Sequence, residues 1–267
     1  MRRLSSLVLV TTLLVACAPA QSSEHVHHVT TPTINVDGAV PAPYGGTSLN
    51  SPLPESLLSL TFTDSDNRTF TLADYADKTV VISNFLTSCQ DSGPMTSKNI
   101  FAAARALSKS SMKDQVIFIE ITVDAQTDTP ARLAAYRKLF GFDSNVILAT
   151  SDAKSLEKLW KYFGAPATKH ELSPQEIKTF PHDWQTGAPA AFHFMHANIV
   201  AVVDANSTWR WMQSGSPDIE ARDLPEAMRA FLSPNGVAVL QQHDEFSWRV
   251  SQVISAIEDV MGHPINS

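Results

Sequence analysis

Cysteine is nearly absent from this sequence, which has only Cys17 and Cys89 among its 267 residues. A framework of several disulfides, the usual support of small exported domains, is therefore excluded. Cys17 follows an apolar N-terminal run, and we expect its sulfur to be modified with lipid at that position, as argued below. Any chemistry that needs a thiol in the body of the chain then depends on Cys89 alone.

Positive charge and long apolar runs are also in short supply. The chain has 20 Lys and Arg against 27 Asp and Glu, a formal net charge of −7 at pH 7, so the basic footprint of a nucleic-acid-binding protein is absent. No segment reaches the ~20 consecutive apolar residues that a transmembrane helix requires. The hydrophobic content of 43% is typical of a globular chain that buries one substantial core.

The first residues have the pattern of a signal peptide, predicted over residues 1–16. Arg2 and Arg3 precede an apolar run that ends in Leu14-Val15-Ala16-Cys17. This ending resembles a bacterial lipobox, so we expect cleavage before Cys17, lipidation of its sulfur, and an extracytoplasmic protein anchored to the bacterial cell membrane by two or more acyl chains. The alternative is an ordinary secretory signal with an incidental cysteine. Loss of residues 1–16 leaves 18 basic against 27 acidic residues, a formal charge of −9.

Residues 17–52 are rich in Pro, Ser, Thr and Gly and contain few large apolar side chains. This composition predicts a flexible tether. Within it, His25, His27 and His28 form a short tract that could bind a metal ion near the membrane. The alternative interpretation of the tract is a solvated polar linker.

From residue 57 onward, strand-like and helix-like periodicities alternate along the chain. The expected elements are a hairpin over 58–63 and 68–72, strands over 79–85, 116–123 and 145–149, and helices over 94–110, 130–140 and 153–163. This order predicts an α/β fold with a mainly parallel sheet and helices on both of its faces.

The second half of the chain is less regular. Residues 166–187 lack a clean period, and we interpret them as a surface insertion of a length that is often functional. Strands over 191–195 and 199–204 are expected to form a terminal hairpin. Helices are expected over 224–232, ending at Ser233-Pro234-Asn235-Gly236, and over 246–261, ending at Gly262.

Cys89 lies in a loop between the expected strand 79–85 and the helix that Pro94 opens. The partial positive charge of a helix N-terminus favours thiolate over thiol, which predicts a lowered pKa and a partly exposed, reactive sulfur. A second cysteine four residues on would complete a Cys-x-x-x-Cys-Pro pair able to bind one metal ion or form one disulfide. Gly93 stands at that position and can do neither.

Several further motifs occur in a fixed order around this loop. Residues 118–124 are followed by Asp128-Thr129-Pro130, then by 136–141, and a late histidine, His196, stands eight residues before Asp204. With these motifs the chain resembles the Sco/SenC family, thioredoxin-fold copper proteins that assist assembly of the copper centre of cytochrome oxidase. The resemblance implies a thioredoxin-like domain over residues 53–232, with residues 233–267 as a C-terminal helical extension.

The resemblance implies a copper site in which Cys89 and His196 are ligands and the second family thiolate is missing. Thiolates suit soft Cu(I), and an added imidazole lets such a site hold Cu(II), so the absence of one thiolate should weaken both states. Met95 could offer a thioether and His193 another imidazole. On a regular strand, however, His193 and His196 would point to opposite faces.

Each of these residues also has a structural interpretation. Cys89 could be a small buried hydrophobe, and His196 a satisfied structural histidine. For Asp91 we favour a role as N-terminal cap of the following helix. Tryptophan side chains are expected in core or edge packing at five positions, Trp160, Trp184, Trp209, Trp211 and Trp248.

The leading functional hypothesis is a membrane-anchored carrier, not an enzyme, that binds copper weakly and delivers it to cytochrome oxidase or to its assembly. Its expected partners are a copper ion, an oxidase subunit and other copper chaperones. The alternative is a copper-free module that keeps the fold for docking. A thiol-disulfide oxidoreductase is disfavoured because Cys89 has no resolving cysteine. A one-cysteine peroxidase is disfavoured because the loop lacks that family's proline and threonine ahead of the cysteine.

Overall fold

The computed structural model describes residues 38–143, 145–241 and 247–264. Cys17 and the tract of His25, His27 and His28 lie outside these residues, so the expectations about the signal peptide, lipidation and the histidine tract remain predictions. Among the described residues, no helix combines the length and the apolar character needed to cross a membrane.

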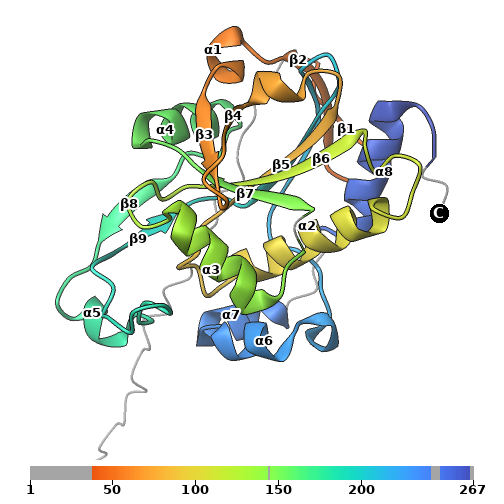
Figure 1. The fold of residues 1–267 in the computed structure, drawn as a ribbon. Helices are drawn as coiled ribbons and strands as arrows, with labels where there is room; N and C mark the ends of the chain where they lie inside the picture. The colour runs from red at the N-terminus through yellow and green to blue at the C-terminus, as the bar shows by residue number, and fades with distance from the viewer. Residues whose placement is uncertain (1–37, 144, 242–246, 265–267) are drawn as a thin grey trace, which may run out of the picture.

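A nine-stranded sheet forms the centre of the molecule (Figure 1). From one edge to the other, its strands are β1 (Val40–Pro41), β2 (Thr47–Pro52), β11 (Thr208–Ser214), β10 (Ile199–Val203), β5 (Thr79–Phe85), β6 (Val116–Thr122), β7 (Val146–Thr150), β3 (Thr61–Asp64) and β4 (Thr69–Thr71). The parallel pairs are β5 with β6 and β6 with β7, whereas β10 and β3 join this centre in antiparallel orientation. The predicted α/β class is confirmed, with parallel pairing confined to the middle of the sheet.

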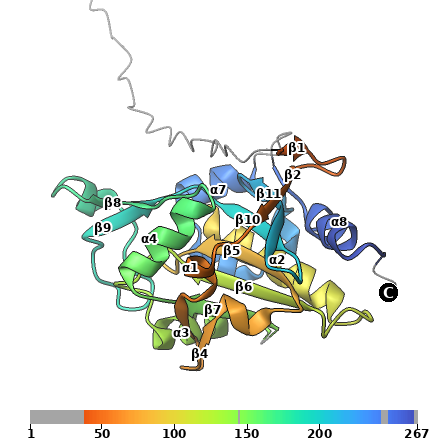
Figure 2. The same ribbon diagram turned by 90° about the horizontal axis from the view of Figure 1, so that it is seen from above.

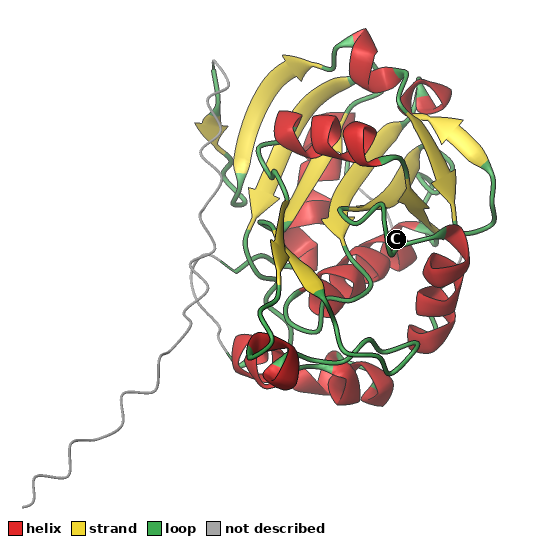
Figure 3. Cartoon of the chain, turned by 90° about the vertical axis from the view of Figure 1, so that its left-hand side faces the viewer, coloured by secondary structure: helices red, strands yellow, loops and turns green. Residues whose placement is uncertain are grey.

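Helices cover both faces of this sheet (Figure 3). The helical elements are α1 (Glu55–Leu58), η1 (Leu72–Tyr75), α2 (Gly93–Leu107), α3 (Pro130–Phe140), α4 (Ala153–Tyr162), α5 (Glu176–Thr179), η2 (Ala221–Asp223), α6 (Glu226–Phe231), α7 (Pro234–Leu240) and α8 (Val250–Met261). Buried residues of α2, α3, α6, α7 and α8 share one core, and those of η1 and α4 belong to the core on the other face.

Alternation along β5 divides its side chains between these two cores. Val81 and Phe85 join the core under α2, whereas Val80 and Ile82 join the core under α4. Because successive side chains of a strand point to opposite faces, an uninterrupted apolar strand of this kind has to lie between two layers.

Local signals set the helix ends that matter for the site. Thr129 caps α3 by accepting a hydrogen bond from the backbone N–H of Arg132, and Pro130 occupies the first helical turn. Gly141 ends the same helix in the left-handed conformation with φ of 63°. These signals explain why the sequence predicts the bounds of α3 correctly.

The N-terminal edge of the sheet begins earlier than the sequence suggests. Residues 47–52, which we expected at the end of the flexible tether, form β2 and pair antiparallel with β11. Leu49 and Leu53 are buried in the core beside α4. The predicted tether is therefore too long at its C-terminal end, because two apolar side chains anchor that segment in the core.

The expected hairpin between residues 191–195 and 199–204 is wrong. Strand β9 (Phe192–Met195) pairs instead with β8 (Thr168–Glu171), which lies within the predicted surface insertion. The hairpin partner of β10 is β11. The two-stranded sheet of β8 and β9 stands at one side of the molecule with α5, away from α8 on the other side (Figures 1 and 2).

The C-terminal extension belongs to the main body of the fold. Helix α8 packs against α2, β5 and β10, and Trp248 is fully buried. The turn at Ser233-Pro234-Asn235-Gly236, expected only to end a helix, also begins α7. Four of the five tryptophans are buried in the two cores, as expected, and Trp184 packs half-buried against Tyr136.

Candidate functional site

The cysteine loop, defined as residues 86–92, connects the C-terminal end of β5 with the start of α2. Asp128 fastens the beginning of this loop. Its carboxylate accepts hydrogen bonds from the backbone N–H and the hydroxyl of Thr87, at 3.0 and 2.5 Å, and from the hydroxyl of Thr122. Burial raises the pKa of Asp128 to about 6, although the bonds from Thr122 and Thr87 oppose that rise.

Arg132 extends this anchor to the insertion. Its Nε donates to the hydroxyl of Thr87 at 2.6 Å, and another guanidinium nitrogen pairs with Asp183 at 2.5 Å. The guanidinium also lies 4.9 Å from the ring centre of Trp184. Because Arg132 is almost fully buried, a side chain of α3 ties the cysteine loop and the insertion into one unit.

Cys89 is half-buried and free, and it packs against the core beside α4. Burial, together with the nearby carboxylate of Asp91, raises the pKa of its thiol to about 11. Hydrogen bonds from the backbone N–H groups of Asp91 and Gly93 act in the opposite direction but do not compensate. The predicted lowering of the Cys89 pKa is therefore wrong, because desolvation and a like charge outweigh the helix N-terminus.

Gly93 begins α2 directly against Cys89. A Cβ atom placed on Gly93 would lie 2.9 Å from both the Cβ and the Sγ of Cys89. Such distances are shorter than real Cβ contacts, so any side chain at position 93 would touch the thiol and displace it slightly. Position 93 thus lies directly against Cys89, four residues on in the sequence, as a two-cysteine loop requires.

Asp91 does not cap α2, which is a further correction. The N-cap is Ser92, whose side chain makes no capping bond, and the carboxylate of Asp91 instead accepts a hydrogen bond from the hydroxyl of Ser233. The backbone N–H of Ser233 also donates to the carbonyl of Gln90 at 2.8 Å. A Cβ on Gly236 would lie only 2.3 Å from that carbonyl oxygen, so α7 approaches the loop as closely as glycine permits.

This contact between α7 and the cysteine loop was missed by sequence reasoning, although a signal for it exists. Ser233 followed by Pro234 is the pattern of a helix start, with a hydroxyl N-cap and proline in the first turn. The hydroxyl of Ser233 accepts a hydrogen bond from the backbone N–H of Gly236 at 3.0 Å, as that pattern predicts. The same four residues also fit the pattern of a helix end, which is the prediction given above for this segment.

His196 lies in the link between β9 and β10, at the same end of the sheet as the cysteine loop. Its Nδ1 is 3.3 Å from the side-chain nitrogen of Asn84 in β5. Two residues on, the side chain of Asn198 donates to the hydroxyl of Ser92 at 2.6 Å, so this link contacts the end of the cysteine loop directly. Burial lowers the pKa of His196 to about 4, so its imidazole is neutral near pH 7 and cannot lower the pKa of Cys89 as a cation.

The two substitute donors considered from the sequence have different surroundings. Met95 is fully buried in the core under α2, whereas Cys89 packs against the core beside α4. His193 lines the same cavity as Cys89, and its ring centre lies 5.1 Å from that of His170 on the paired strand β8. Because β9 ends at Met195, the alternation that we applied to His193 and His196 does not extend to His196.

A cavity of about 680 Å³ opens beside the thiol of Cys89. Its walls come from the cysteine loop, from the insertion together with β9, and from the start of α7. The last wall is formed by Ser233, Pro234 and Asn235. We call this space the Cys89 cavity.

The described residues contain no group of three or more His, Cys, Asp and Glu placed to hold a metal ion. At this end of the sheet, the candidate metal donors are the thiol of Cys89 and the neutral imidazole of His196. One soft and one borderline donor suit copper, but they leave most of its coordination to other groups.

A family model described as SCO1/SenC matches residues 57–210. Solved structures similar to this chain include a SCO1/SenC family lipoprotein from Bacillus anthracis, 23% identical over 69% of this chain and 95% of that chain, with a TM-score of 0.49. Copper-bound ScoI from Bradyrhizobium japonicum is 19% identical over 68% of this chain and 96% of that chain, with a TM-score of 0.46. Yeast Sco1 is 16% identical over 60% of this chain and 87% of that chain, with a TM-score of 0.46. No curated protein matches the sequence.

Proposed function

Because the chain belongs to the SCO1/SenC family, we propose that it is an extracytoplasmic copper carrier that assists delivery of copper to cytochrome oxidase or to its assembly. Cys89 and His196 are the proposed ligands, and copper is the cargo. Cys17 is the proposed lipid anchor, and residues 17–37 the remaining tether. Residues 53–232, completed by β2 and the C-terminal helices, form the copper-handling domain.

One observation carries this proposal. The loop brings position 93 within 2.9 Å of the Cys89 sulfur, as measured from a Cβ placed on Gly93. This close approach is what a two-cysteine metal loop would need, and it supports the proposal although Gly93 supplies no sulfur. A buried structural cysteine would need neither this approach nor a cavity beside it.

The proposed site should bind copper with low affinity, because the protein supplies only two donors. A site with two protein donors leaves two or more positions of a copper ion to water or to an incoming partner. Loss of a ligand should lower metal affinity by more than the ~10–100-fold typical of losing an outer contact. Weak retention favours a carrier that passes its cargo on over a storage site.

Copper titration of the full chain in detergent tests the proposal. We expect Cu(I) under reducing conditions, and Cu(II) in a separate titration without reductant, each to bind weakly but saturably at one equivalent per chain, and Cys89→Ser and His196→Ala each to lower the affinity at least tenfold. His263→Ala is the matched control, since His263 is exposed beyond α8. Equal affinity in wild type and Cys89→Ser would contradict the proposal.

A second candidate is a copper-free docking module that retains the family fold. The observation in its favour is that the described residues contain no group of three metal-binding side chains. This alternative predicts no copper binding in that titration that depends on Cys89 and His196, with retained association to an oxidase subunit or a partner chaperone. The two candidates are therefore separated by one measurement.

A further inference from the structure

The Cys89 cavity has one apolar wall. Leu172, Phe180, Phe192 and Phe194 line it, and all four come from the insertion and β9. Phe192 and Phe194 are in edge contact at 5.9 Å between ring centres. A wall of three phenylalanines and a leucine beside a thiol is suited to apolar side chains of a ligand.

The Asp, Glu, Lys and Arg side chains that line the cavity are all acidic. Its lining, as far as the described residues show it, includes four carboxylates, those of Asp91, Asp124, Glu176 and Asp183, and no Lys or Arg. Asp183 is neutralised by its ion pair with Arg132, which leaves three. Hydrogen bonds from Ser173 hold the pKa of Glu176 at about 2, so this carboxylate at the rim is ionised throughout the neutral range.

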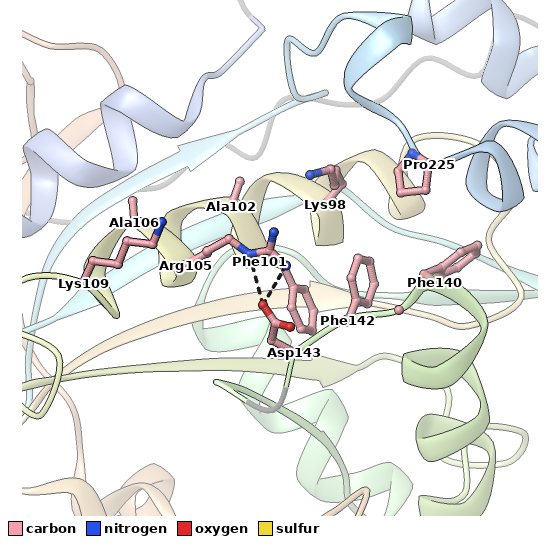
Figure 4. Close-up of a pocket in the computed structure, with 11 residues that line it drawn as sticks. Lys98, Phe101, Ala102, Arg105, Ala106, Lys109, Phe140, Phe142, Asp143 and Pro225 are labelled. Atoms are coloured by element: carbon pink, nitrogen blue, oxygen red, sulfur yellow. Dashed lines mark hydrogen bonds and ion pairs between the residues drawn. The ribbon is translucent and has the colours of Figure 1, made fainter.

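This negative lining is a local property, because another depression of the same molecule has the opposite character. Figure 4 shows Lys98 and Arg105 of α2, and Lys109 just beyond it, along a depression of about 420 Å³. Among the described residues that line this depression, Asp143 supplies the one carboxylate. Asp143 is bonded to Arg105 at 2.8 Å. A positively charged ligand would be repelled there and attracted to the Cys89 cavity.

The apolar wall is also able to accept cations. The ammonium group of Lys169 lies 4.0 Å from the ring centre of Phe192 and pairs with Glu171 at 2.7 Å. Aromatic rings attract cations through their negative faces. The wall therefore already holds one ammonium group of this chain beside the cavity.

The size of the cavity limits what can enter. A volume of about 680 Å³ is within the roughly 300–1,000 Å³ range of pockets that enclose small ligands, so it admits a few side chains and not a folded domain. We propose that the Cys89 cavity receives an extended segment of a partner protein that carries apolar side chains flanked by lysine or arginine. The proposal rests on the proposed function, since such a segment would bring a metal-binding group of the partner to Cys89.

Thiol exchange with activated peptides tests the proposal without any metal. Three peptides share one cysteine and a Phe-Leu core, and are flanked by Lys, Gln or Glu. Each is used as its mixed disulfide with thionitrobenzoate, in the presence of a chelator. The thiolate of Cys89 attacks the peptide sulfur, a new disulfide joins Cys89 to the peptide, and thionitrobenzoate leaves with the electron pair of the broken bond, so no further oxidant is needed.

We expect the Lys-flanked peptide to react about tenfold faster than the Glu-flanked peptide at low salt, with the Gln-flanked peptide between them. The ratio should approach one at high salt. The rate measured with Cys89→Ser is subtracted, because Cys17 could also contribute a thiol. Replacing Phe-Leu by Ser-Gly should slow the Lys-flanked peptide severalfold.

Two variants change the charge of the lining in opposite directions. Glu176→Gln should lower the ratio of rates between the Lys- and Glu-flanked peptides severalfold, and Gln175→Glu should raise it, while an uncharged small disulfide reacts equally with all forms. Glu157→Gln on the exposed face of α4 is the control and should leave the ratio unchanged.

Equal rates for the three peptides, or a ratio that neither lining variant changes, would overturn the proposal. So would a charge preference without any dependence on the Phe-Leu core, since that is attraction to the whole acidic protein. Failure here leaves the copper titration unaffected, because the exchange is measured in the absence of metal.

Discussion

At position 93 a hydrogen atom stands where a side chain would touch the thiol of Cys89. This one residue determines whether the loop holds one sulfur or two. The geometry is close to that of a disulfide but tighter, because paired cysteines have Cβ atoms roughly 3.5–4.5 Å apart whereas the Cβ placed on Gly93 lies 2.9 Å from that of Cys89. A shift of roughly 0.6 Å or more in the loop would be required to reach that range.

Gly93→Cys should therefore raise copper affinity at least tenfold and form an intramolecular disulfide under mild oxidant, since it adds a soft ligand beside Cys89. Copper titration and thiol counting before and after reduction measure both effects. Gly93→Ala is the matched control, because it displaces Cys89 in the same way without adding sulfur. Two free thiols in oxidised Gly93→Cys would contradict the prediction.

At the scale of elements, the start of α7 determines the position of the cysteine loop. Ser233 bonds to Gln90 and Asp91, and Gly236 lies against the carbonyl of Gln90. These contacts come from a segment beyond the residues that the family model matches. The side of the loop that faces the Cys89 cavity is thus shaped by this chain's own C-terminal region.

Gly236→Ala should move α7 away from the loop, because its new Cβ would lie 2.3 Å from the carbonyl oxygen of Gln90. Overpacking of this kind costs typically about 1–3 kcal/mol of stability. We expect alkylation of Cys89 by a bulky maleimide to become severalfold faster as the wall opens. Val237→Ala, an exposed change on the same helix, should leave the rate unaltered. The same rate in Gly236→Ala would show that α7 does not shield the thiol.

Elements whose signals are local could be predicted from the sequence, and those that depend on distant partners could not. The bounds of β5 and α3 follow from an apolar run and from Thr129, Pro130 and Gly141. The pairing of β9 with β8 across the insertion has no local signal. For the same reason the sequence identifies Cys89 and His196 as a pair of interest but gives the wrong direction for the Cys89 pKa, which burial by the surrounding chain determines.

At the scale of the whole molecule, a carboxyl group lies in the core between α2 and the sheet. Glu120 of β6 is fully buried and accepts one hydrogen bond, from Ser97 at 3.1 Å. Within the described residues its other oxygen has no partner. Burial raises the pKa of Glu120 from its usual 4.5 to about 8, against the opposing effects of Ser97 and Arg137. The folded protein thus takes up a proton that the unfolded chain releases.

This difference makes global stability depend on pH. The folded state binds more protons than the unfolded state between about pH 4.5 and 8, so the contribution of Glu120 is fully present below pH 4.5 and is lost as the pH rises toward 8. The loss is about 1.4 kcal/mol per pH unit in that window.

Glu120→Gln should remove this dependence, because the amide does not ionise. The free energy of unfolding is measured in urea at pH 5 and at pH 8. Between these pH values, the free energy of unfolding of wild type should fall more than that of the variant, even if the two proteins differ in stability at pH 5. Glu157→Gln, on the exposed face of α4, is the control, and its free energy of unfolding should change between pH 5 and pH 8 as that of wild type does. A difference between wild type and Glu120→Gln that is the same at both pH values would refute the prediction.

The two edges of the large sheet end in its shortest strands. β1 has two residues, one of them Pro41, which has no N–H to donate, and β4 has three. Long open edges invite the strands of other molecules to pair with them and begin aggregation. Neighbouring copies held close together by the proposed lipid anchors would therefore find little backbone to pair with at either edge of the large sheet, and the proteins could crowd on a membrane surface without joining their large sheets.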